Sequence, residues 1–102
     1  MKKRLFLFQD NLEALLKANK VVLDGNVLYV LKTKHSFLLT PAVKVISCET
    51  SVNDPFQLVG KFIPTKLLAA RGADLFIGSF IYKNQSYQVE PGFLGALSEK
   101  KP

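Results

Sequence analysis

The chain has 102 residues, of which 48% are hydrophobic and 22% charged, and its formal net charge is +6. That length suits one domain, and the composition is too apolar and too weakly charged for a disordered protein. We therefore expect a single domain over residues 1–102. No run of about 18 apolar residues occurs, so a membrane-spanning helix is not expected.

The positive charge is concentrated at the two ends of the chain. Five of the fourteen basic residues are Lys2, Lys3, Arg4, Lys100 and Lys101, and the other nine are set against eight acidic residues. The body of the protein is therefore nearly neutral, and we expect basic, mobile ends at residues 1–4 and 98–102. Nucleic-acid binding is disfavoured, because a neutral body can neutralise few phosphates.

The N-terminus does not have the pattern of a secretory signal. The apolar stretch after the basic residues covers only 5–8, whereas a signal peptide needs about 7 to 15 apolar residues. The single cysteine, Cys48, excludes a disulfide within the chain and agrees with a reducing compartment. These features together favour a cytoplasmic protein.

Hydrophobic periodicity and turn residues divide the chain into helices and strands. Leucines at helical spacing follow Asp10 and Asn11, either of which could cap a helix, and Asp24-Gly25 between two β-branched runs predicts a type I′ hairpin. The expected elements are a helix over 11–19, strands over 20–23, 26–33, 37–39, 42–49 and 56–63, a short helix over 65–71, and strands over 75–82 and 87–90. This pattern predicts an α+β fold with a mainly antiparallel sheet of five to six strands, which could form a small, partly open barrel.

Five positions are expected to have structural roles in turns, at a helix end or inside a strand. Gly25 belongs to the first hairpin, and Gly72 is placed where a left-handed residue would end the short helix. Gly78 would give a neighbouring strand room inside the strand over 75–82, and Pro91-Gly92 predicts a type II turn. Because Gly72 follows a helix instead of preceding one, a phosphate-binding loop is disfavoured.

The sequence predicts no catalytic, cofactor-binding or metal-ligating residue. His35 is the only histidine and falls in an expected turn, while Cys48 lies beside Glu49, which would raise its pKa. One histidine and one cysteine are too few ligands for a Cys/His zinc site. A nucleophile with an adjacent base, as covalent catalysis requires, is not evident.

Eleven aromatic residues are many for a small core, and two short helices can hardly cover both faces of the sheet. We therefore expect an exposed apolar surface that makes a homodimer or binds an unidentified protein partner. The candidate interface residues are Phe76, Phe80, Tyr82, Phe93 and Leu94. The leading hypothesis is a small, non-enzymatic binding or interaction module with a regulatory role; the alternatives are a nucleic-acid-binding small β-barrel with basic tails and an enzyme subunit with an interface site.

Overall fold

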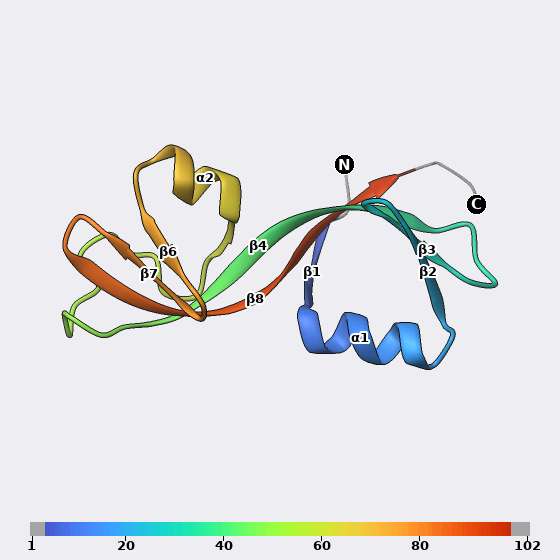
Figure 1. The fold of residues 1–102 in the computed structure, drawn as a ribbon, viewed down its shortest axis with the longest axis horizontal. Helices are drawn as coiled ribbons and strands as arrows, with labels where there is room; N and C mark the ends of the chain where they lie inside the picture. Colours follow the sequence, from blue (N-terminus) through green and yellow to red (C-terminus); the bar gives the residue numbers. More distant parts are fainter. Residues whose placement is uncertain (1–3, 99–102) are drawn as a thin grey trace. The chain divides into compact units, whose positions relative to one another are not determined.

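A computed structural model describes residues 4–98 and contains two helices and one antiparallel sheet (Figure 1). The elements, in chain order, are β1 (Arg4–Phe8), α1 (Gln9–Lys17), β2 (Val21–Asp24), β3 (Val27–Val30), β4 (Ser36–Cys48), β5 (Phe62–Pro64), α2 (Thr65–Ala70), β6 (Asp74–Phe76), β7 (Ser79–Tyr82) and β8 (Gln85–Ser98). The strand order is β2-β3-β4-β8-β7-β6; β1 also pairs with β8, and β5 with β4.

The predicted α+β class, the antiparallel sheet and the partly open barrel are confirmed. Six strands form the main path, as expected, and the two additional pairings of β1 and β5 bring the sheet to eight strands. The main path ends at β2 and β6, so the strand order does not close on itself. Both predicted helices are present, and the short one lies at the expected place.

Two compact units divide the chain, and two long strands run through both of them. Unit 1 comprises residues Met1–Thr40 and Phe93–Pro102, and unit 2 comprises Pro41–Gly92. The strand β4 begins in unit 1 and ends in unit 2, while β8 runs in the opposite order. The single domain over 1–102 stays a prediction, which we take up in the Discussion.

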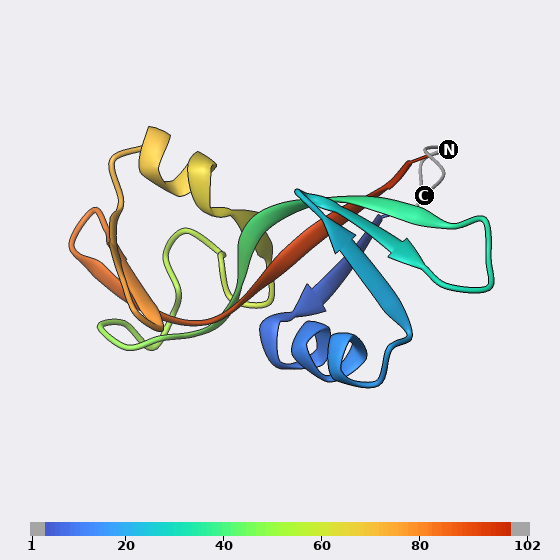
Figure 2. The same cartoon turned by 45° about the vertical axis from the view of Figure 1, so that its right-hand side comes forward.

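Unit 1 packs α1 against the first strands of the sheet (Figure 2). Its buried cluster consists of Leu12 from α1 and Val21, Leu28 and Leu39 from three different strands. The strand β1 was not predicted, because its four apolar residues follow a basic run that resembles a tail. Of the predicted mobile ends, residues 1–3 and 99–102 lie outside the described residues, whereas Arg4 begins β1 and Ser98 ends β8.

The first hairpin is formed one residue further along the chain than predicted. Asp24 pairs with Val27, so the two loop residues are Gly25 and Asn26 instead of Asp24-Gly25. Gly25 has a positive φ of 61°, as a two-residue hairpin loop with glycine in the first position requires. The carbonyl of Asn26 accepts a hydrogen bond from the backbone N–H of Leu39, at 2.7 Å, which fixes the loop on β4.

Two prolines continue strands: the sequence left an edge, a bulge or a break open at Pro41, and it predicted a turn at Pro91-Gly92. Pro41 lies within β4, between Leu38, the last residue paired with β3, and Ala42, the first paired with β5. Its missing N–H therefore removes no bond to either strand. The turn expected at Pro91-Gly92 is wrong, because Gly92 lacks the positive φ that a type II turn requires, and β8 continues through both residues.

Unit 2 differs most from the prediction in its strands. The expected strand over 75–82 is a hairpin, because Phe76 pairs with Ser79 and leaves Ile77-Gly78 as the loop. Gly78, with a φ of 79°, therefore makes a turn instead of giving room to a neighbouring strand. The predicted strand over 56–63 is reduced to β5.

Hydrogen bonds to Asp54 explain the lost strand. Its carbonyl accepts from the N–H of Gln57, and its carboxylate Oδ2 accepts from the N–H of Val59 at 2.7 Å. Because these donors turn the chain around one aspartate, the segment after it cannot supply a continuous ladder. The predicted loop over 50–55 is present and extends to residue 61.

The helix termini confirm one capping prediction and correct another. Gly72 has a φ of 82°, and the N–H of Ala73 donates to the carbonyl of Leu68, so α2 ends in a Schellman motif as expected. No side chain caps the start of either helix. Asp10 lies within the first turn of α1, where its charge suits the positive end of the helix dipole.

Candidate functional site

The hairpin formed by β6 and β7 carries the most exposed apolar side chains of unit 2 on a sheet edge. Because β6 is the last strand of the path, one side of it has no partner strand within residues 4–98. Phe76 is 57% exposed, and Ile77 in the loop is fully exposed. Ile81 also remains partly exposed on β7, opposite Asp74. The hairpin therefore offers an open edge and an apolar tip together.

The structure does not bring the five predicted interface residues to one surface. Phe76 is exposed, but Phe80 is only 1% exposed and stacks on Tyr87 with ring centroids 5.1 Å apart. Tyr82 is half-buried, and its ring meets Phe56 edge-on at 5.2 Å. Phe80 is thus a core residue of unit 2.

The two remaining candidates, Phe93 and Leu94, are half-buried residues of unit 1. Phe93 packs against the buried cluster of that unit. Of the five predicted structural positions, Gly25, Gly72 and Gly78 adopt the left-handed backbone that turns require, whereas Pro91 and Gly92 continue β8.

A buried tyrosine and a partly buried aspartate form a side-chain hydrogen bond in unit 2. The hydroxyl of Tyr87 donates to Asp54 Oδ1 at 2.8 Å. Burial raises the pKa of the Tyr87 hydroxyl. The hydrogen bond to Asp54 and the negative charge of Asp54 raise that pKa further. Partial burial would raise the pKa of Asp54, but the N–H of Val59 and the Tyr87 hydroxyl stabilise its charged form and lower that pKa overall.

The pKa shifts favour a tyrosine that remains the donor and an aspartate that remains charged. A tyrosine whose pKa lies above its ordinary range holds its proton at neutral pH, and a carboxylate with a lowered pKa is a weak base. The pair was missed at the sequence level because its members are 33 residues apart in a loop and a strand. The only signal was a tyrosine in an expected strand and an Asp-Pro turn.

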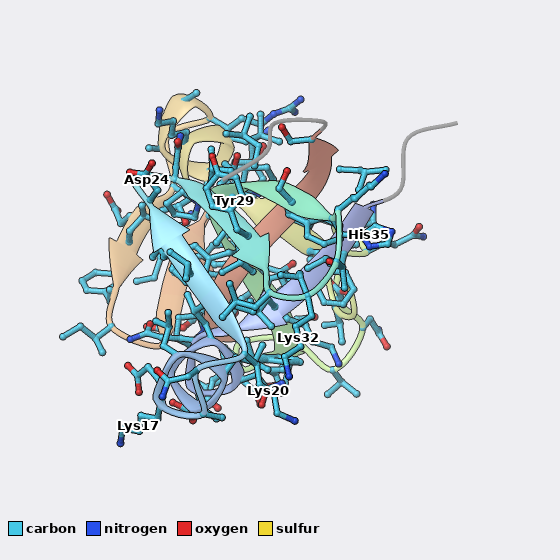
Figure 3. All side chains as sticks on the ribbon, turned by 90° about the vertical axis from the view of Figure 1, so that its right-hand side faces the viewer. Lys17, Lys20, Asp24, Tyr29, Lys32 and His35 are labelled. Carbon is cyan, nitrogen blue, oxygen red and sulfur yellow. The ribbon has the colours of Figure 1, made fainter. Side chains whose placement is uncertain are left out.

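The only cysteine of the chain ends β4, and the only histidine lies between β3 and β4. The Cys48 thiol is half-buried and donates to Gln85 Oε1, which also accepts from the Thr50 hydroxyl at 2.8 Å. His35 is exposed in the turn after β3, at the opposite end of the hairpin from Asp24 (Figure 3). Its backbone N–H donates to Thr33 Oγ1. Among residues 4–98, no three His, Cys, Asp or Glu side chains gather where they could hold a metal ion.

A cavity of about 340 Å³ opens between α2, β5 and the loop before it. Its lining residues are Leu58, Lys61, Phe62, Ile63, Pro64, Leu67, Leu68, Arg71 and Tyr82. Seven of these nine side chains are apolar or aromatic, and the two others are cationic. No carboxylate lines the cavity. This site was not predicted, since residues 56–63 resemble a regular strand that would not fold back on the helix.

Unit 1 contains a second, smaller groove of about 250 Å³, lined by seven apolar or aromatic residues and one lysine, Lys20.

In the described part of the chain, neither helix has the length or the apolar character to cross a membrane. No protein-family model, curated protein or solved structure matches the chain.

Proposed function

We propose that the chain is a non-enzymatic interaction module that assembles as a homodimer through the β6–β7 hairpin. One observation carries this proposal: an unpaired edge strand is followed directly by the fully exposed Ile77. Edge strands present unsatisfied N–H and C=O groups and are usually blunted by charge or by a covering segment. Here the only charged residue of the edge strand is Asp74, at its start.

A twofold pairing of two β6 strands would place Phe76 of each copy beside the other copy. Burying a large apolar side chain contributes about 1.5–3 kcal/mol, and in a symmetric dimer each residue counts twice. Phe76 and Ile77 would then contribute up to about 6–12 kcal/mol before the entropic cost of association, about 4–15 kcal/mol, is subtracted, so that backbone hydrogen bonds between the two edge strands must supply the rest.

Sedimentation equilibrium tests the dimer. We expect the wild type to associate at micromolar concentrations, and a Phe76→Thr, Ile77→Asn double variant to dissociate at least about tenfold more readily. Val52→Asn is the matched control, because Val52 is equally exposed but lies in a loop without a strand. A single species near 11.4 kDa at every concentration would overturn the homodimer.

The placements of His35 and Cys48 support the non-enzymatic part of the proposal. Since the Cys48 thiol donates to an amide oxygen and His35 is an exposed turn residue, neither has the partner that activates a nucleophile. The cytoplasmic location is proposed on the single free thiol. We expect His35→Ala and Cys48→Ser to leave self-association unchanged, which the same sedimentation measurement would show.

A further inference from the structure

We infer that the cavity between α2 and β5 binds a small amphiphile with an anionic head and an unbranched apolar tail. Ile63 and Leu68, which belong to the buried core of unit 2, line its apolar part, and the half-exposed Phe62 and Leu67 lie closer to solvent. Binding cavities in proteins have this character: mostly apolar walls with a few polar groups that orient the ligand. A volume of about 340 Å³ holds roughly ten non-hydrogen atoms, at about 30 Å³ each.

Charge complementarity decides the nature of the head group. Lys61 and Arg71 both line the cavity, are exposed, and are its only charged residues. Two further ammonium groups lie over rings of lining residues: Lys44 Nζ is 5.8 Å from the ring centroid of Phe62, and Lys83 Nζ is 5.3 Å from that of Tyr82. Two cationic side chains thus line the cavity, and two more contact the rings of residues that line it.

The end of α2 does not cancel this field. A helix C-terminus carries about half a negative charge, which is less than the charge of Arg71 alone. Several of the last carbonyls of α2 already accept hydrogen bonds, because the N–H groups of Arg71, Gly72 and Ala73 donate to Leu67, Leu68 and Ala69. A carboxylate head can therefore meet the planar guanidinium of Arg71 and the ammonium of Lys61.

This inference is independent of the proposed dimer. Neither Phe76 nor Ile77 lines the cavity. The Phe76→Thr, Ile77→Asn variant should consequently bind the amphiphile as the wild type does, so each proposal can fail without the other.

Decanoate, used below its micelle concentration, is the probe, with decanol as the neutral analogue and decyltrimethylammonium as the cationic one. Titration calorimetry should show decanoate binding at least about fivefold more tightly than decanol, and no binding of the cation. From hexanoate to decanoate, affinity should rise by about fourfold for each methylene that is buried. Amide chemical shifts should change in β5 and α2.

Charge-neutralising variants locate the head group. Lys61→Gln and Arg71→Gln should each weaken decanoate binding by about two- to fivefold and leave decanol binding unchanged. Lys66→Gln is the matched control, because Lys66 is exposed on the same helix but does not line the cavity. Unchanged urea midpoints would show that all three variants remain folded.

Four results would overturn the inference. The first is equal affinity for decanoate and decanol, and the second is equal affinity of the three lysine and arginine variants. The third is a response confined to the groove of unit 1 that includes Lys20. The fourth is binding only to vesicles of anionic lipid and not to monomeric decanoate. Shifts confined to β5 and α2, with the charge dependence above, would support it.

Discussion

At the scale of single residues, Tyr87 organises the core of unit 2. Its side chain is fully buried, its ring stacks on Phe80, and its hydroxyl reaches Asp54 in the loop after β4. The same aspartate accepts the backbone N–H of Val59. One tyrosine thus ties a β-strand to a loop that contains no regular structure of its own.

Replacing Tyr87 by phenylalanine should destabilise the protein by about 1–2 kcal/mol, because it keeps the stacked ring and removes a hydrogen bond to a charged acceptor. Tyr82→Phe is the control, since Tyr82 is half-buried and contributes ring contacts. Equilibrium urea unfolding would measure both variants. Equal midpoints for the two would mean that the hydroxyl of Tyr87 contributes nothing.

The same contact predicts how stability changes at high pH. Burial, and then the charge of Asp54, raise the pKa of Tyr87 in the folded protein above its ordinary value of 10.0. The unfolded chain therefore releases this proton first, and the stabilisation is complete below pH 10 and lost as the pH rises above it. We expect the free energy of unfolding to fall more steeply above pH 10 in the wild type than in Tyr87→Phe. Parallel curves would contradict this.

At low pH the sign is reversed for Asp54. Its pKa is lowered from the ordinary 3.8, so the charged form stabilises the folded state. That contribution is present above the unfolded pKa and is lost as the pH falls through the folded one. Asp54→Asn should therefore flatten the loss of stability below about pH 4, measured by urea unfolding from pH 2 to pH 6. Asp24→Asn, an exposed residue of unit 1, serves as the control.

At the scale of elements, both helices end in the same way. Asn19 after α1 and Gly72 after α2 have φ values of 56° and 82°, and the residue that follows each donates back to the last turn. A β-carbon at Gly72 would meet no atom within 4 Å, so any cost of a side chain there is a backbone cost.

Gly72→Ala should therefore cost about 1 kcal/mol, whereas Gly72→Asn should cost clearly less, because asparagine tolerates the left-handed region. Asn19→Gly should be neutral or slightly stabilising. Urea midpoints of the three variants test this. If Gly72→Ala and Gly72→Asn were equally destabilised, backbone geometry would not explain the requirement for glycine.

The elements also show what could be predicted from the sequence. The end of α2 at Gly72 was predicted, because it depends on local backbone chemistry, whereas the gap expected between the strands over 75–82 and 87–90 is a tighter turn at Lys83-Asn84. The hairpin at Ile77-Gly78 was missed, since an apolar run with one internal glycine fits a buried strand equally well. In the structure the two halves of the run pair with each other, Leu75 with Phe80 and Phe76 with Ser79, and apolar periodicity alone does not distinguish this pairing from one continuous strand.

The cavity between α2 and β5 was missed for a related reason. Backbone N–H groups of Gln57 and Val59 donate to Asp54, and the segment over 56–63 therefore does not form the predicted strand. Hydrophobic periodicity does not encode hydrogen bonds of this kind. The interface residues were predicted by strand alternation over 75–82. That alternation breaks at the loop of the hairpin, and Phe80 is buried while Phe76 is exposed.

At the scale of the whole molecule, each unit has its own buried cluster, and β4 and β8 contribute residues to both units. Because two strands continue from one unit into the other, we expect the chain to unfold as a single cooperative domain. Val21→Ala in unit 1 and Ile63→Val in unit 2 should each destabilise by about 1–2 kcal/mol.

Native-state hydrogen exchange would decide whether the chain is one domain. In a single domain, either variant lowers the protection of the most protected amides in both units by the same free energy. In two independent domains, each variant affects only the amides of its own unit. The second result would overturn the single domain over 1–102.

Unit 2 is continuous in the sequence, whereas unit 1 is completed only by the residues after Gly92. On the ribosome, residues 1–40 are made first, yet they must wait for the second half of β8, whose Ser98 carbonyl accepts the hydroxyl of Ser36. Synthesis at about 5–20 residues per second supplies that segment within roughly a second of Gly92. All residues of unit 2 are therefore synthesised before the last residues of unit 1. During that interval the apolar strands β2 and β3 lack the second half of β8, which completes their unit.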